Sequence, residues 1–247
     1  MPPEPRSRVD LNGDDFARHR ESRSFRPFGS QADWLWQHSR HRPPPSHLWL
    51  SITKVYGRIY LVTTIYLVQY GDKERLPGDP GLTELGKRQA EVTARWLRAT
   101  GLQAVYSSPL RRARETAEPV SQATGLAVQV DSRLRERLNW DGTQAFGAFL
   151  AEWDRSAEDR DLVLSNGESS RSAGERLRLF LAGLAGGSGP VAVVSHGGVT
   201  VDLLRNLLGD EGLPPRLIAD GIPPCAISTL DDLHVTGIAA TGHLTGL

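Results

Sequence analysis

The sequence predicts an α/β fold in which a mostly parallel central sheet carries helices on both faces. Short apolar runs rich in strand-forming residues, at 65–68 and 191–194, alternate with longer segments of helical periodicity. This alternation is typical of parallel strands joined by crossover helices. Strands that are apolar on both faces indicate a sheet that is covered on each side.

From residue 65 onward, the elements are expected to follow one another in a regular order. Strands are predicted at 65–68, 104–106, 127–130, 191–194, 225–230 and 233–239. The first helix is predicted to begin after Thr83, whose hydroxyl suits an N-cap, and to extend to Gly101. Further helices are predicted at 109–123, 145–153, 173–184 and 199–208.

Residues 1–61 differ in composition from the rest of the chain. They are rich in Arg, Pro, His and Ser, contain three consecutive prolines at 43–45, and lack a sustained helical or strand period. We expect either a poorly ordered N-terminal extension over 1–61 or a misassigned start, with Val62 as the first residue of the native chain. In both cases the folded domain is predicted to span 62–247.

Composition and charge narrow the class of protein. The 29 basic and 29 acidic residues balance, which argues against a generic nucleic-acid or anionic-membrane binder. Cys225 is the single cysteine, so an internal disulfide is excluded and a reducing cytoplasm is the simplest location. No stretch approaches the roughly 20 apolar residues of a membrane span. We expect a soluble cytoplasmic protein.

Three predicted strands lead directly into glycine-rich or polar segments. The first is followed by Gln-Tyr-Gly-Asp at 69–72, the second by Ser-Ser-Pro-Leu-Arg-Arg-Ala at 107–113, and the run 191–194 by Ser-His-Gly-Gly at 195–198. Ligands of open α/β sheets bind at the carboxyl ends of strands. Helix N-termini at such positions favour anions. The sequence therefore predicts an anion site at this edge of the sheet.

In this order and spacing, these segments and Leu-Arg-Glu at 134–136 resemble the histidine phosphatase superfamily, in its phosphoglycerate-mutase-like branch. The resemblance implies a phosphoglycerate-mutase-like fold over 62–247. It also implies two-step phosphoryl transfer through a phosphohistidine. In that reaction, two arginines and a second histidine hold the phosphoryl oxygens, and a carboxylic acid protonates the leaving oxygen. Fixed cations suit this chemistry because the transferred group carries spread negative charge.

The resemblance carries site residues over one by one. Arg112 matches the second arginine, Glu136 the acid/base glutamate, and His196 the second active-site histidine. Gly71 and Gly197 stand where backbone groups of the family face the phosphate. No cofactor is implied.

The first motif departs from the family pattern. In the family this motif reads Arg-His-Gly-Glu, and its histidine is the nucleophile. Tyr70 replaces the nucleophilic histidine, and a phenol with its usual pKa near 10 is mostly protonated at neutral pH. Gln69 replaces the arginine, which removes a fixed charge and a bidentate phosphate contact. The cost of losing a nucleophile is on the order of 10³–10⁶ in turnover.

Three interpretations follow from these departures. The first is a phosphatase-fold protein that is catalytically impaired and retains a phosphate-ester-binding cleft. The second is an active phosphomonoesterase or mutase-like hydrolase that uses Tyr70 or water as its nucleophile. The third is a re-purposed pocket, with acid/base chemistry on another substrate, or a partner-binding module in which the N-terminal segment makes the contact.

Partners are predicted only by class. We expect a small phosphorylated molecule or another anion, no nucleic acid and no membrane, and keep a second copy of the chain as a candidate partner. The seven histidines match no defined zinc spacing, so no metal is predicted. The segment 140–168 contains no recognisable motif that identifies a substrate.

The aromatic residues of this segment have a helical spacing that fits packing in the core as well as a place at the mouth of a cleft: Trp140, Phe146, Phe149 and Trp153.

Overall fold

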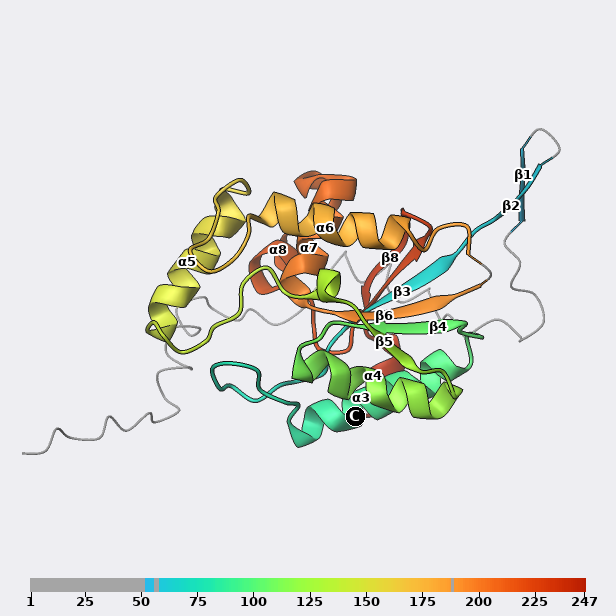
Figure 1. The fold of residues 1–247 in the computed structure, drawn as a ribbon, viewed down its shortest axis with the longest axis horizontal. Coiled ribbons are helices and arrows are strands. Elements are labelled where there is room, and N and C mark those ends of the chain that lie inside the picture. Colours follow the sequence, from blue (N-terminus) through green and yellow to red (C-terminus); the bar gives the residue numbers. More distant parts are fainter. Residues whose placement is uncertain (1–51, 56–57, 188) are drawn as a thin grey trace, which may run out of the picture. The chain divides into compact units, whose positions relative to one another are not determined.

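The computed structural model describes residues 52–55, 58–187 and 189–247. A six-stranded sheet of order β5-β4-β6-β3-β7-β8 forms the centre of this part of the chain, with helices on both faces (Figure 1). The strands β3 (Thr64–Gln69), β4 (Ala104–Ser107), β5 (Val128–Val130) and β6 (Val191–Ser195) are parallel. The strands β7 (Ile227–Asp231) and β8 (His234–Ala240) complete the sheet as an antiparallel edge. The predicted fold class is confirmed.

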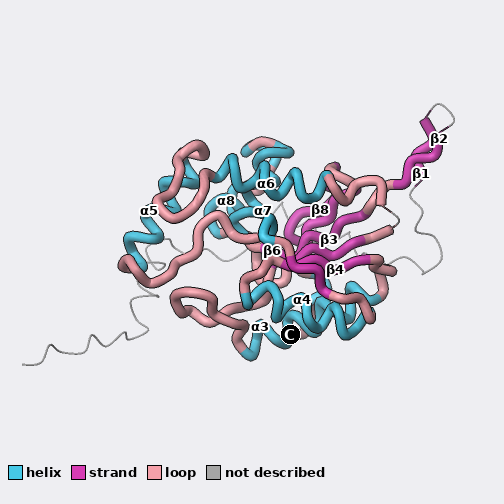
Figure 2. The backbone as a smooth tube through the Cα atoms, viewed as in Figure 1, coloured by secondary structure: helices cyan, strands magenta, loops and turns pink. Residues whose placement is uncertain are grey.

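The central strand β3 is apolar on both sides, and this explains why both faces of the sheet are covered by helices. Along β3, Ile65 and Leu67 point into one apolar cluster, while Tyr66 and Val68 point into the other. Full burial of such side chains is worth roughly 1.5–3 kcal/mol each. One face of the sheet packs against α3 (Glu84–Arg98) and α4 (Arg111–Thr124), and the other against α6 (Ser170–Ala182) and α7 (Gly197–Leu208) (Figure 2).

Side-chain acceptors bind the first backbone amides of both α3 and α4. The Thr83 hydroxyl accepts the amide of Gly86 at 3.0 Å, as predicted, so α3 begins at Glu84. The N-cap position of α4 is Leu110, which has no capping side chain. Asp79 supplies the missing acceptor from the preceding loop, because both its carboxylate oxygens accept the Arg111 amide, at 2.8 and 3.0 Å. The loop 72–82 is thereby tied to the start of α4.

Some elements differ from the sequence-based predictions. The helix predicted at 145–153 continues further, as α5 (Phe146–Glu158). The strand predicted at 225–230 begins two residues later, because Cys225 adopts a positive φ of 54° before β7. A short helix, α8 (Pro215–Asp220), was not predicted. None of the helices in the described part of the chain is both long and apolar enough to cross a membrane.

The predicted extension over 1–61 is described only at its end. There, β1 (Ile52–Val55) and β2 (Arg58–Leu61) form a two-stranded antiparallel hairpin with Thr53 opposite Tyr60. The remainder of the extension lies outside the described residues. The division at 61/62 therefore stays a prediction.

The C-terminal segment places a histidine against α3. His243 lies in a short 3₁₀ turn, η3 (Gly242–Leu244), with its ring 5.7 Å from that of Trp96 and its Nε2 3.0 Å from the Thr93 hydroxyl. Burial lowers the pKa of His243 to about 4. The unfolded chain, with a histidine pKa near 6.5, therefore binds more protons between pH 6.5 and 4.

We expect this histidine to make the fold acid-sensitive. The contribution of His243 to the free energy of unfolding is fully present above pH 6.5 and is lost as the pH falls through 4. The part of this loss that occurs between pH 7 and pH 5 is about 1–2 kcal/mol. Urea unfolding at the two pH values should show a smaller difference for His243→Gln than for the native protein. His234→Gln, at an exposed position on β8, is the matched control. An equal pH dependence in His243→Gln would contradict the prediction.

Candidate functional site

The register of the sheet brings three of the predicted motifs to one edge. Gln69 at the end of β3 lies beside Ser195 at the end of β6, and Ser107 at the end of β4 lies beside Val194. The pairing continues beyond the strands, because the Tyr70 amide donates to the Ser195 carbonyl at 3.2 Å. The Ser108 amide donates likewise to the Val194 carbonyl, at 3.0 Å. Residues 70, 108 and 196 therefore follow three adjacent strand ends.

Tyr70 is enclosed by His196 and Arg112, the two residues for which the sequence resemblance predicts phosphate contacts. Its ring centroid lies 5.3 Å from that of His196, and the guanidinium carbon of Arg112 lies 4.9 Å above the ring. Burial raises the pKa of the Tyr70 phenol above its usual value, and Glu136 adds to the rise, while Arg112 opposes it. The phenol is thus held in its neutral form near pH 7.

His196 is fully buried at the start of α7. Its Nε2 lies 2.7 Å from the hydroxyl oxygen of Ser108, and its Nδ1 has no hydrogen-bond partner among the described residues. Burial holds the pKa of His196 well below its ordinary value, and the charges of Arg112 and Arg176 lower it further. The imidazole is therefore neutral, and it can serve as a hydrogen-bonding group rather than as a cation.

Arg112 is a buried guanidinium with unused donors. Its side chain is 3% exposed, and its Nη2 donates to the amide oxygen of Asn139 at 3.1 Å. The nearest carboxylate, that of Asp79, lies 3.8 Å from Nη1. Neither Nε nor Nη1 has a hydrogen-bond partner within the described part of the chain. Buried donors are rarely left unpaired, so these two nitrogens mark a place where an anion can bind.

Glu136 lies at the N-terminus of α7. Its two carboxylate oxygens accept the backbone amides of Gly198 and Val199, both at 2.9 Å, and one of them also accepts the amide of Arg137. An anion is favourable at this position, where the first helical amides have no partner within the helix. A side chain at position 198 would crowd the carboxylate, because a Cβ there would lie 2.7 Å from its Oε1. Gly198 thus permits the close approach.

The remaining predicted residues lie around this centre. Gln69 is buried, and its Oε1 has no hydrogen-bond partner among the described residues. Gly197 lies against it, since a Cβ there would be 3.5 Å from the Gln69 amide group. The Gly71 amide donates to the Thr116 hydroxyl at 3.0 Å, and so does not point a free donor at a ligand in this structure. Gly71 also packs against the backbone of Gly86, which leaves no room for a side chain.

Sequence reasoning missed three residues of this neighbourhood. Ser108 and Asn139 contact His196 and Arg112 directly, and Ser108 was present in the second motif without a role. Trp153 on α5, which the sequence analysis considered for core packing or the mouth of a cleft, lies within contact of Gly198. The pKa of Lys73 is lowered by burial and by the charge of Arg112, which places a second cation near that guanidinium. No sequence signal separates Asn139 or Lys73 from ordinary loop residues.

The arrangement brings together two unpaired nitrogens of the buried Arg112, a neutral imidazole at position 196 and a protonated phenol at position 70. Among the described residues, no group of three or more His, Cys, Asp or Glu side chains could hold a metal ion.

Comparison with known proteins places the chain in a family. A model of the histidine phosphatase superfamily (branch 1) matches residues 71–233. The chain belongs to this superfamily. The match begins at Gly71, immediately after Gln69 and Tyr70. A probable phosphoglycerate mutase, GpmB, of Yersinia pestis (strain Pestoides F) is 31% identical over 184 residues, covering 68% of this chain and 84% of that protein.

Solved structures give the same result for the fold. The native mycobacterial glucosyl-3-phosphoglycerate phosphatase has a TM-score of 0.58 at 29% identity, covering 73% of this chain and 100% of that one. Its complex with inorganic phosphate has a TM-score of 0.56 at 30% identity, covering 72% of this chain and 95% of that one. A structure named mycobacterial hydrolase 1 has a TM-score of 0.57 at 30% identity, covering 68% and 91%.

Proposed function

We propose that this protein binds a phosphate ester, or another small anion, at the edge of the sheet formed by β3, β4 and β6, and that its phosphoryl-transfer activity is impaired. The observation that carries the proposal is Tyr70, which stands at the nucleophile position with its pKa raised by burial. A neutral phenol is a weak nucleophile, and deprotonating it here would place a second negative group near Glu136.

Anion binding rests on the polar atoms that the fold leaves unpaired. Arg112 contributes the unpaired Nε and Nη1, and His196 contributes Nδ1. Placing donors of this kind on phosphoryl oxygens supplies short, charge-assisted hydrogen bonds. The complex of the mycobacterial relative with inorganic phosphate supports the same class of ligand.

Gln69 also supports the loss of turnover, because a neutral amide cannot replace a guanidinium in holding the charge of the transferred group.

Calorimetric titration with inorganic phosphate tests the binding part of this proposal. We expect the native protein to bind phosphate, and Arg112→Met to bind it at least about tenfold more weakly, since a hydrogen bond to a charged group is worth about 1.5–3 kcal/mol. Arg111→Met is the matched control, because that neighbouring guanidinium is exposed and pairs with Glu115 at 2.6 Å. Equal phosphate affinity in both variants would overturn the assignment of Arg112.

A further inference from the structure

The loop 72–82 places a carboxylate beside the unpaired nitrogens of Arg112. The nearest oxygen of Asp79 lies 3.8 Å from Nη1 of the guanidinium, which is too far for a hydrogen bond. The Asp79 side chain is 46% exposed, whereas the guanidinium beside it is buried. The negative charge of Asp79 therefore acts on Arg112 without occupying either of its unpaired nitrogens.

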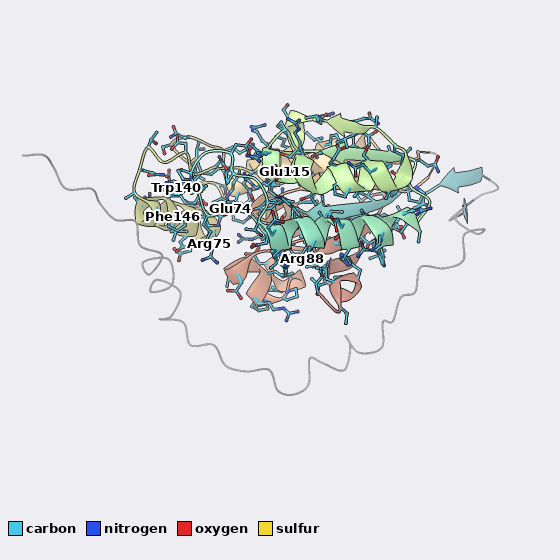
Figure 3. All side chains as sticks on the ribbon, turned by 90° about the horizontal axis from the view of Figure 1, so that it is seen from below. Glu74, Arg75, Arg88, Glu115, Trp140 and Phe146 are labelled. Carbon is cyan, nitrogen blue, oxygen red and sulfur yellow. The ribbon has the colours of Figure 1, made fainter. Side chains whose placement is uncertain are left out.

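Contacts on both sides of the loop hold Asp79 in this position. Its carboxylate oxygens accept the Arg111 amide at the start of α4, at 2.8 and 3.0 Å. The preceding residue, Gly78, donates its amide to the Trp140 carbonyl at 2.8 Å. Figure 3 shows Trp140 next to Glu74, at the start of the same loop. The carboxylate is thus fixed in the wall of the anion site.

An anion bound to Arg112 lies close enough to Asp79 to be repelled by it. Charge-assisted hydrogen bonds to a guanidinium are about 2.7–2.9 Å long. Adding this length to the 3.8 Å between Nη1 and Asp79 places an anion oxygen on Nη1 no further than about 7 Å from the carboxylate. The Debye length is about 10 Å at 0.1 M salt, so charges at this separation are only partly screened.

The other groups of the site do not cancel this repulsion. Gln69 is neutral, and burial raises the pKa of the Tyr70 phenol, which is therefore protonated. Lys73 is a second cation near the guanidinium, and Glu136 is a second carboxylate near the phenol. These two side chains add one charge of each sign. A ligand therefore feels the charge of Asp79, and the repulsion grows with each negative charge that the ligand carries.

We propose that Asp79 is a specificity-determining residue, which lowers the affinity of the anion site for doubly charged ligands relative to singly charged ones. This proposal rests on the proposed function, because the ligand must lie on Arg112. A doubly charged phosphate monoester meets twice the repulsion that a singly charged phosphate diester meets. Asp79 thus shifts the selectivity of the site toward esters that carry a single charge.

Sulfate and methanesulfonate test this role, because the two tetrahedral anions carry two charges and one charge at neutral pH. One pair of unit charges about 7 Å apart in water changes an affinity by a factor of about 3. In calorimetry at low ionic strength, we expect Asp79→Asn to bind methanesulfonate about threefold and sulfate about sevenfold more tightly than the native protein. The sulfate-to-methanesulfonate affinity ratio should therefore rise at least about twofold.

Two neutral variants and one control separate the effect of charge from an effect on folding. Asn keeps an oxygen for the Arg111 amide at the start of α4, and Asp79→Ser, with its hydroxyl oxygen, should raise the ratio in the same direction. Asp161→Asn makes the same chemical change at a 68% exposed carboxylate that pairs with Arg171 on α6. This control should leave the ratio unchanged.

The outcomes distinguish the role of Asp79 from the proposed function. If the native protein binds sulfate and the ratio does not rise in Asp79→Asn or in Asp79→Ser, the role of Asp79 is wrong and anion binding stands. If neither the native protein nor Asp79→Asn binds sulfate or inorganic phosphate, the proposed function is overturned, and the role of Asp79 with it.

Discussion

The double variant Gln69→Arg/Tyr70→His should hydrolyse a generic aryl phosphate at least about 10³ times faster than the native protein. The two substitutions give residues 69–71 the Arg-His-Gly order that the sequence resemblance predicts for the first motif, and the family match begins at Gly71. An imidazole at position 70 provides a nucleophile that is unprotonated at neutral pH, and a guanidinium at position 69 provides a second fixed cation beside Arg112.

The geometry of the site accommodates a histidine at position 70. An imidazole is smaller than the phenol that now lies between His196 and Arg112. At position 69, the buried glutamine side chain lies beside Gly197, so an arginine there would extend from the same edge of the sheet. The other predicted groups are in place, with Arg112 holding two unpaired nitrogens.

Single variants show which substitution matters for turnover. We expect Gln69→Arg alone to remain as slow as the native protein, because it lacks a nucleophile, and Tyr70→His alone to be intermediate. Adding Arg112→Met to the double variant should remove the gained activity. If the native protein already hydrolyses aryl phosphates as fast as the double variant, and Tyr70→Phe abolishes that activity, then Tyr70 is a working nucleophile and the proposal of impairment is wrong.

Replacing Arg137 by methionine should destabilise the fold by about 3–5 kcal/mol at pH 8. Arg137 and Asp202 form a buried ion pair, 3% and 0% exposed, in which one guanidinium nitrogen contacts both carboxylate oxygens at 2.7 and 2.8 Å. Without the guanidinium, the Asp202 carboxylate keeps only the Ser170 hydroxyl among these partners. An uncompensated buried charge is the physical cause of the loss.

The loss should depend on pH in a defined direction. Burial raises the pKa of Asp202 to about 6, with Arg137 opposing the rise, so removing Arg137 raises it further. A raised pKa means that the folded state holds a proton that the unfolded state releases. The variant should therefore be least destabilised near pH 5, where Asp202 is protonated, and should lose stability as the pH rises through 6 and above.

Urea unfolding of three variants checks this prediction. Arg137→Met/Asp202→Leu removes both charges and should recover most of the lost free energy of unfolding, since a buried pair replaced by apolar groups is often neutral in stability. Arg133→Met, which removes an exposed partner of Asp131, is the control and should change the stability by less than about 1 kcal/mol. A destabilisation of Arg137→Met that is the same at pH 5 and pH 8 would rule out the buried-charge explanation.

Much of the fold was predictable because local patterns agree with the final packing. The runs at 65–68 and 191–194 are apolar on both faces, and in the structure they are the two central strands of the sheet. Thr83 caps α3 as its hydroxyl suggested. The helix α8 was missed because six residues between glycines carry no measurable period.

The order of the motifs along the chain was sufficient to predict that Tyr70, Arg112, Glu136 and His196 gather at one edge. What these residues do there depends on contacts between residues far apart in sequence. The charge of Arg112 on Tyr70, the donation of two α7 amides to Glu136, and the full burial of His196 each require the closed sheet. Protonation depends on burial and neighbouring charge, which no local pattern encodes. The sequence by itself determined the superfamily, and it predicts the exchange of the first motif at Gln69 and Tyr70. The tertiary structure alone decided that Tyr70 is neutral and that Arg112 has unpaired donors, because burial and long-range contacts arise only when the strands and helices pack.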